Sequence, residues 1–387
     1  ADLTAMGLAP MEGCEDPTDV DYGNYIHTNG SVMVFIPAFA IRIGNASAPL
    51  YSKYGADTIE IGDVGLNGKD GWAIPRGFYD GGKLHSGFFI DKYLCSKDLT
   101  GKLAVSVKLG EPILLSLANN VGSTFMPDCG GSATDAIILS RARGEHYALV
   151  SCYQWAIISL ISLAHAQAAT SVASCAWYDA AGLTNYPKGN NANTTDPKKD
   201  VDDKSIYYSV STYSKFASTT GSATPLVKTT HNGQYSGITD VNGNMWQPVL
   251  GVSNSEANIF KAAKLSVKMH DFTMSNHDSA SLFDSYTVAI FNQNQFNYWK
   301  SPALFTPDDP EFPLCGVVPK SSMLSSNGTE RFGKDGIYIE SVTDSMMLVA
   351  GSFRTGTNAG VWCRDCGDYW RNRNNAYSFR VAGYPPP

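Results

Sequence analysis

The stretch 146–178 constrains the fold most, because it contains no Lys, Arg, Asp or Glu. Its first part reads YALVSCYQWAIISLISLAHA and is long enough to cross a membrane as a helix. Ser, Gln and His side chains dilute this run, however, and that favours a helix in a protein core over a transmembrane span. We therefore expect a buried helix over about 146–168, with His165 as a hydrogen-bonded core histidine.

The composition indicates a globular, loop-rich protein that contains β-strands. The chain has 387 residues, of which 43% are hydrophobic and only 17% are charged, and it carries 36 Gly and 20 Tyr. A polar but weakly charged surface of this kind is common outside the cytosol. The formal charge of −7 argues against binding to phosphate backbones. We expect no nucleic-acid partner and no direct membrane insertion.

Hydrophobic runs and turn residues predict the organisation of the chain. Residues 1–30 are acidic and Gly-rich, which is typical of an N-terminal leader or attachment segment, and 31–387 form one domain. Within this domain the polar run 182–204 is an insertion expected on the surface and includes the glycosylation sequon Asn193-Thr194-Thr195; the resemblance given below implies an insertion over 182–232. Strands are expected at 31–43, 57–61, 84–94, 103–109, 265–272, 285–291, 336–342 and 345–353, the last two as a pair.

Motifs for common enzyme chemistry are missing from the sequence. It has no Walker-type loop, GxSxG elbow, HExxH or Rossmann fingerprint. The eight cysteines are widely spread, so most are expected to be buried thiols, with one or two disulfides left open. Cys363 and Cys366 form a CxxC that lacks the second pair of a zinc site. We expect no catalytic residue, no metal site and no cofactor.

Calcium is the alternative that remains open. Carboxylates in turns could supply the oxygen ligands that Ca²⁺ prefers, and solvated turn carboxylates explain the same residues equally well. The candidates are Asp196, Asp200, Asp202, Asp203 and Asp240.

The C-terminal stretch 351–387 has an unusual amino-acid composition. It reads GSFRTGTNAGVWCRDCGDYWRNRNNAYSFRVAGYPPP and holds five of the ten Arg, yet it contains no Lys, Glu, Gln or Met. Arg, Asn, Asp, Tyr and Trp crowded together are typical of a recognition surface. Apolar residues bracket the polar run, which a free tail would not need: Val361, Trp362, Phe379 and Val381.

Two motifs give the chain a resemblance to a known fold. The turn Gly243-Asn244-Met245-Trp246 and the closing triplet Ser378-Phe379-Arg380 resemble motifs of the formylglycine-generating-enzyme branch of the C-type lectin fold. Gln247 stands where that family has an acidic residue, and Ser378 stands where it has Gly. The resemblance implies an α+β, C-type lectin fold of the formylglycine-generating-enzyme-like kind.

Within that branch the chain is similar to the variable proteins of diversity-generating retroelements, whose relatives include the phage major tropism determinant. In such systems adenines of AAY codons are randomised, and the products cannot encode Lys, Glu, Gln, Met or Trp. Every residue of 363–377 except Trp370 is reachable in this way, which would explain the missing residue types.

This resemblance implies a ligand- or receptor-binding protein of a virion or cell surface, with a hypervariable region at 351–387. Its partner would be an unknown protein or glycan on a target surface. Trp362, Trp370 and Phe379 would be fixed scaffold, and Arg380 would make a structural hydrogen bond or ion pair. The alternative is a copper oxidase that uses Cys363 and Cys366. The expected ligand contacts are Cys363, Arg364, Asp365, Cys366, Asp368, Tyr369, Arg371, Asn372, Arg373, Asn374, Asn375 and Tyr377.

Overall fold

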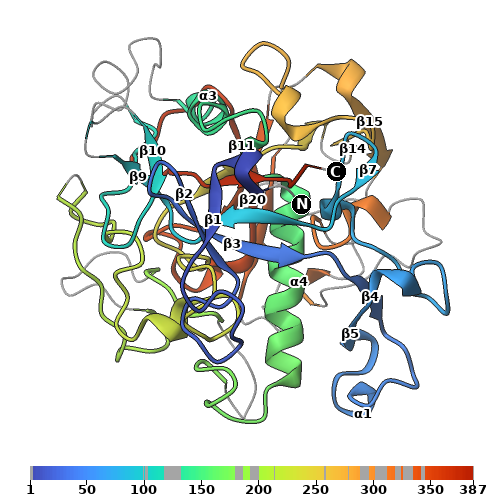
Figure 1. The fold of residues 1–387 in the computed structure, drawn as a ribbon. Coiled ribbons are helices and arrows are strands. Elements are labelled where there is room, and N and C mark those ends of the chain that lie inside the picture. Colours follow the sequence, from blue (N-terminus) through green and yellow to red (C-terminus); the bar gives the residue numbers. More distant parts are fainter. Residues whose placement is uncertain are drawn as a thin grey trace.

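The computed structural model describes residues 3–98, 100, 103–116, 132–178, 186–191, 200–212, 214–256, 259–277, 279–287, 296–300, 312–318, 324–325, 334–340 and 345–386. In this part of the chain the fold is mixed, rich in sheet and loop, with few helices, as an α+β class requires (Figure 1).

The first sheet joins both ends of the described chain. Its strands are all antiparallel to their neighbours, in the order β1 (Leu8–Pro10), β2 (Asn24–His27), β3 (Val32–Pro37), β8 (Gly87–Asp91), β21 (Val381–Gly383) and β11 (Tyr147–Leu149). The expectation of a separate leader over 1–30 is therefore wrong for its described residues. Met6 and Leu8 are buried in the main core, and β1 and β2 extend the sheet.

The second sheet has the C-terminal stretch near its middle. Its order is β12 (Gln247–Val249), β19 (Ser345–Ala350), β20 (Gly360–Tyr369), β18 (Gly336–Ile339), β16 (Asn297–Trp299) and β17 (Leu324–Ser325). β20 runs antiparallel to β19 and parallel to β18. The expected pairing of β18 with β19 is wrong, because β20 is inserted between them.

Smaller units complete the architecture. They are the pairs β4 (Ala40–Ile43) with β5 (Ile59–Gly62), β6 (Tyr79–Asp80) with β7 (Lys83–Leu84) and β9 (Cys95–Lys97) with β10 (Ala104–Ser106), and the three-stranded sheet β13 (Val252–Glu256), β14 (Ile259–Ala263) and β15 (Phe283–Thr287). Two short helices are α1 (Tyr51–Tyr54) and α3 (Asp135–Arg141). Short 3₁₀ turns are η1 (Leu3–Met6), η2 (Gly55–Asp57), η3 (Val64–Leu66), η4 (Arg76–Phe78), η6 (Leu226–Thr229), η7 (Met269–Asp271), η8 (Ala280–Leu282), η9 (Phe312–Leu314) and η11 (Gly356–Asn358).

The strand expected at 265–272 does not form. Residues 264–272 make turns and η7 instead. Val267 and Met269 are both buried and lie two apart, so they have the period of a strand, but no described strand pairs with them.

The long helix α4 (Cys152–Ala168) runs through the middle of the molecule (Figure 1). Ser151 and Gln154 form a capping box at its start. Trp155 Nε1 and Ser159 Oγ both donate to the Val361 carbonyl of β20, at 3.0 and 2.8 Å. The prediction of a core helix is confirmed for Cys152–Ala168, whereas its expected first turns are wrong because Tyr147–Leu149 form strand β11. In the part of the chain that the structure describes, no helix combines the length and apolarity needed to cross a membrane.

Two expectations near α4 are wrong. His165 lies on the exposed side of the helix, so it is not a core histidine. The part of the insertion at 186–191 is mostly buried rather than solvated, because Asn190 and Asn191 pack against the turn at Gly243. The amide of Gly243 in turn donates a hydrogen bond to the carbonyl of Ala350. The sequon at Asn193 lies outside the described residues.

Candidate functional site

Residues 360–369 of the C-terminal stretch form the inner strand β20, which has a strand paired to each of its edges. Cys363, Arg364 and Cys366 are buried completely or nearly so. The expectation that these three side chains contact a ligand is therefore wrong for this conformation. A central strand with packed layers on both faces buries side chains of either parity.

Arg364 is a structural residue instead. Its guanidinium faces α4 and donates to Ser159 Oγ at 3.1 Å and to the carbonyl oxygens of Val317, Gly316, Val361 and Cys363 at 2.9–3.2 Å. All five donors are thus used. Burial lowers its pKa to about 10, so the side chain remains charged at neutral pH.

The two cysteines of the CxxC are free thiols. Burial raises the pKa of both Cys363 and Cys366. Copper ligation needs an accessible thiolate, so this environment does not favour the oxidase chemistry. Cys129 lies outside the described residues.

After β20 the chain forms a loop that main-chain hydrogen bonds hold in place. Thr134 N donates to Trp370 O, and Ala133 N donates to Asn372 O, at 3.0 and 3.1 Å. Asn374 N donates to Leu115 O at 2.7 Å. We call residues 369–375 the display loop. Its course depends largely on backbone groups of distant segments, and the side chains of Asn372 and Asn374 add local hydrogen bonds.

Asp368 fixes the base of the display loop. Its carboxylate accepts hydrogen bonds from Asn372 Nδ2 and from the hydroxyl of Tyr377. Tyr377 is buried, so the expectation that it contacts a ligand is also wrong. Asn374 Oδ1 accepts from Ala376 N at 2.9 Å, which gives this side chain a local structural role as well.

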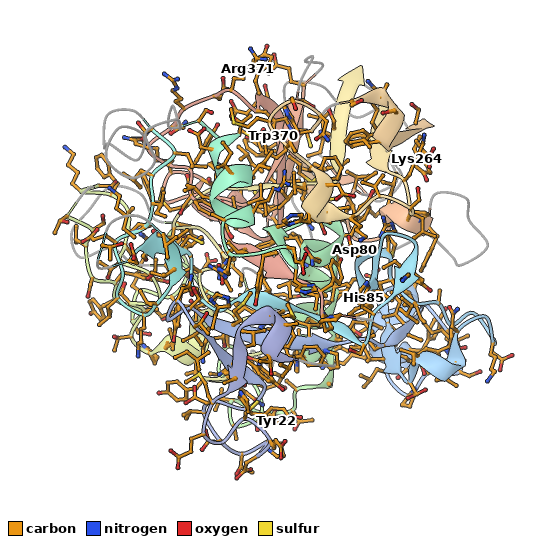
Figure 2. All side chains as sticks on the ribbon, turned by 45° about the horizontal axis from the view of Figure 1, so that its top comes forward. Tyr22, Asp80, His85, Lys264, Trp370 and Arg371 are labelled. Carbon is orange, nitrogen blue, oxygen red and sulfur yellow. The ribbon has the colours of Figure 1, made fainter. Side chains whose placement is uncertain are left out.

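The remaining expected contacts lie at the surface. Tyr369, at 41% exposure, is exposed together with Arg371 and Arg373, whereas Asp365, Asp368, Asn372, Asn374 and Asn375 are half-buried. Figure 2 shows Arg371 at the outer edge of the molecule and Trp370 beneath it. Within the described part of the chain, no hydrogen bond or ion pair engages the side chains of Tyr369, Arg371, Arg373 or Asn375. These four are available to a partner.

Asp365 stands between the buried and the exposed half of this stretch. Burial raises its pKa to about 7, and the nearby carboxylates of Asp368 and Glu340 act in the same direction. A hydrogen bond from Gly367 N to Asp365 Oδ1 opposes them. The charge at the foot of the display loop therefore changes near neutral pH.

The expected scaffold residues are where the sequence placed them. Trp362, Trp370 and Phe379 are buried, and Arg380 makes structural hydrogen bonds. Arg380 Nε donates to Gln247 Oε1 at 2.8 Å, and its other nitrogens donate to main-chain oxygens of Asp91, Lys92, Thr239 and Asp240.

The two motifs that carry the resemblance meet in space. Trp246 N donates to Ala376 O at 2.8 Å, and Ser378 N donates back to Trp246 O at 2.9 Å. Gln247, the departure from the family motif, serves as the neutral partner of Arg380.

Among the calcium candidates, the carboxylates of Asp200, Asp203 and Asp240 already have partners. Asp200 accepts hydrogen bonds from the backbone of Gly189, Asp202 and Asp203, and Asp203 pairs with Lys228 at 2.7 Å. Across the described ranges, no three His, Cys, Asp or Glu side chains are grouped so that they could hold a metal ion. Asp196 lies outside those ranges.

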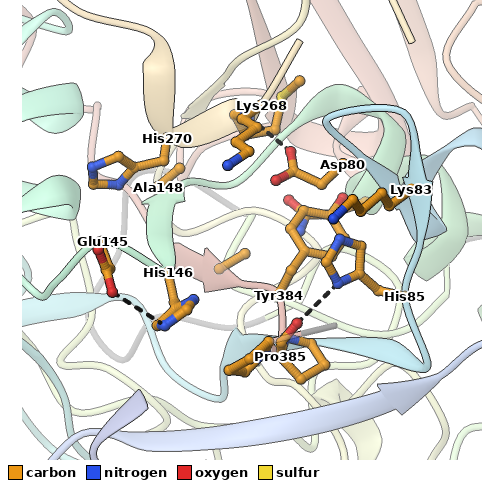
Figure 3. A pocket seen from close by; sticks show the side chains of 14 residues that line it. Asp80, Lys83, His85, Glu145, His146, Ala148, Lys268, His270, Tyr384 and Pro385 are labelled. Atoms are coloured by element: carbon orange, nitrogen blue, oxygen red, sulfur yellow. Dashed lines mark hydrogen bonds and ion pairs between the residues drawn. The ribbon is translucent and has the colours of Figure 1, made fainter. Parts of the chain in front are cut away.

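Sequence reasoning missed a pocket of about 140 Å³ elsewhere on the molecule, which several charged and polar side chains line (Figure 3). Its walls come from segments too far apart in the chain to form any recognisable motif. The residues that line it are Asp80, Lys83, His85, Glu145, His146, Ala148, Gln154, Lys268, Met269, His270, Ala382, Tyr384, Pro385 and Pro386.

Comparison with known proteins gives little similarity. No family model and no curated protein matches the chain. Among solved structures it is similar to one named "Major Tropism Determinant U1 Variant", with 10% sequence identity and a TM-score of 0.31. The match covers 92% of this chain and 63% of that one, so this chain spans less than two thirds of that protein. A likeness at this level defines neither a fold family nor a function.

Proposed function

We propose that this chain is a ligand- or receptor-binding protein with a C-type-lectin-like fold, and that it binds its partner through the display loop. The contacting side chains are Tyr369, Arg371, Arg373 and Asn375. Tyr and Arg are the residues that most often dominate binding energy, and Asn supplies adaptable hydrogen bonds. The partner is a protein or glycan on a target surface, and the chain acts on a virion or cell surface.

One observation carries this proposal: a loop held by its backbone presents side chains that have no internal role. Main-chain bonds from Thr134, Ala133 and Asn374 position the loop, while Arg371 and Arg373 point to solvent. A partner can therefore be bound without a large ordering cost in the loop. Substitution of exposed side chains changes stability little, typically within about 0.5 kcal/mol.

A pair of variants distinguishes side chains that bind the partner from side chains that stabilise the fold. Replacing Arg371 and Arg373 by Ala should leave the melting temperature nearly unchanged and abolish binding to cells or virions that carry the partner. Tyr377→Phe should lower the melting temperature and leave binding nearly unchanged. Asp368 loses the hydroxyl donor of Tyr377 in this variant, which costs about 1–3 kcal/mol of stability. The measurements are thermal unfolding and binding to a panel of candidate target cells. Full binding by the double Arg variant would contradict the proposal.

The proposal includes diversification by a retroelement. The DNA beside the gene should then hold a near-copy of the sequence encoding about 350–385, which differs only at adenines, and a reverse transcriptase gene. Because Arg364 and Cys366 are buried, the differences should concentrate in codons 369, 371, 373 and 375. Neighbouring DNA without such a repeat would remove hypervariability from the proposal and leave the binding test standing.

A further inference from the structure

The pocket of Figure 3 is assembled from five separate parts of the chain. The β6–β7 hairpin supplies Asp80 and Lys83, and His85 follows it directly. The other walls are residues 145–148, the first turn of α4, residues 268–270 and the C-terminal residues 382–386. None of these residues belongs to the display loop.

Hydrogen bonds between the walls hold the pocket open in one shape. Met269 N donates to Asp80 Oδ1, and Gly82 N donates to Leu265 O, both at 2.8 Å. His85 Nδ1 donates to Pro385 O at 2.9 Å, a bond drawn in Figure 3. The pocket is therefore formed before any ligand arrives, which reduces the entropic cost of binding.

Polar atoms without partners line this cavity. Gln154 is only 1% exposed; its Oε1 accepts from Ser151 N at 2.9 Å, and its amide nitrogen has no partner among the described residues. His85 is 9% exposed, and since Nδ1 is bound to Pro385 O, its Nε2 is the ring nitrogen left without a described partner. Neither belongs to the fully buried side-chain atoms that lack a partner, so both atoms can be reached from the cavity, and each can bond a water or a ligand there.

The charges around the cavity determine which partner fits. The side chains of Lys83 and Lys268 lie at the rim, exposed, and within the described chain neither forms an ion pair. Gln154 is in the first turn of the 17-residue helix α4, whose N-terminus adds a partial positive charge.

Two carboxylates oppose these positive groups. Glu145 lies 3.6 Å from His146 Nε2 and is mostly exposed. Asp80 lies deeper, and burial raises its pKa, which weakens its negative charge in this position. Its Oδ2 has no described hydrogen-bond partner and can accept one from a hydroxyl group.

We propose that this pocket binds a small oxyanion, a carboxylate or a phosphate, between the ammonium groups of Lys83 and Lys268 and the amide of Gln154. A hydroxyl group next to the oxyanion donates to Asp80. The volume of about 140 Å³ corresponds to the space of roughly five waters at about 30 Å³ each. It accommodates one such group with a few attached atoms, and not a drug-sized molecule, which needs at least about 300 Å³.

Calorimetric titration of the full chain with inorganic phosphate and with lactate, at constant ionic strength, tests the proposal. We expect saturable binding of at least one probe. Tighter binding of lactate identifies a hydroxy acid as the ligand type, and tighter binding of phosphate identifies a phosphate group. Absence of saturable binding by both probes would overturn the proposal.

Variants locate the bound anion. Lys268→Met should weaken binding at least about tenfold, which corresponds to about 1.4 kcal/mol. Lys264→Met is the matched control, because Lys264 donates to Ser281 O outside the pocket and should not affect binding. Gln154→Glu keeps the acceptor of the capping box and places a negative charge against the ligand, so it should abolish binding. Equal affinity in the Lys268 and Lys264 variants would place the anion elsewhere and refute the site.

Discussion

Asp365 is a residue whose ionisation opposes folding. Its native pKa of about 7 lies above the ordinary value of 3.8, so the native state holds a proton that the unfolded state releases. The loss of folding stability that ionisation of Asp365 causes is absent in acid. It develops as the pH rises from about 4 to 7 and is complete above pH 7.

Asp365→Asn removes the ionisation. We expect the variant to be more stable than the parent protein by on the order of 1 kcal/mol at pH 8, with a gain that shrinks towards pH 4.5. Urea unfolding at four pH values measures the difference. A gain that is constant across pH, or larger in acid, would show that the native carboxyl is not held protonated.

Residue types, read one at a time, were informative where a side chain has only one suitable environment. Trp362, Trp370 and Phe379 are large and apolar, and the core was their only stable place. Arg residues are different, because Arg371 is exposed while Arg364 is buried. The residues next to them in the sequence do not distinguish the two environments. The difference arises from tertiary packing: α4 offers Arg364 the Ser159 hydroxyl, and the turn at residues 316–317 offers it carbonyl oxygens.

At the scale of elements, the contact between α4 and β20 determines which part of the C-terminal stretch is internal. Ser159 is central to it, since its hydroxyl donates to Val361 O and accepts from Arg364 Nη2. Ser159→Ala leaves a buried guanidinium donor unpaired. We expect a loss of about 1–3 kcal/mol in the free energy of unfolding.

Ser162→Ala is the control for that prediction. Among the described residues its hydroxyl donates only to Ile158 O within the helix, at 2.8 Å, and that carbonyl already takes part in the helical hydrogen bonds. This change should cost clearly less than the Ser159 change. Denaturant melts of the two proteins, made side by side, give the comparison, and equal losses would mean that the Arg364 contact contributes nothing.

Element prediction from the sequence succeeded for local patterns and failed for pairing. The charge-free run predicted a core helix, and α4 is one. The order of β18, β20 and β19 could not be predicted, because a strand's neighbours are chosen by long-range packing. The pocket was unpredictable for the same reason: His85 and the carbonyl of Pro385 that it binds are 300 residues apart.

At the scale of the whole molecule, Arg380 ties the two large sheets together. It binds Gln247 in β12 of one sheet and the carbonyl of Asp91 in β8 of the other. Lys has at most three donors and no planar fork, so Arg380→Lys leaves buried carbonyl groups without partners. We expect a loss of about 3–5 kcal/mol, because the charge stays buried while its partners are lost.

Both sheets should melt together in that variant if Arg380 links them. Tryptophan fluorescence and far-ultraviolet circular dichroism would then give one coincident transition at lower temperature. Arg373→Lys, at an exposed site where the side chain has no described partner, should shift the transition little. Separate transitions for the two probes would show that the sheets fold as independent units.

The way in which the display loop is fastened has a practical consequence for protein engineering. Its anchors are peptide groups, which nearly every amino acid supplies, and proline at position 374 is an exception because it lacks the N–H that reaches Leu115. A combinatorial library over positions 369, 371, 373 and 375 should thus yield thousands of members that share one backbone. The molecule could serve as a platform for selecting new affinity reagents.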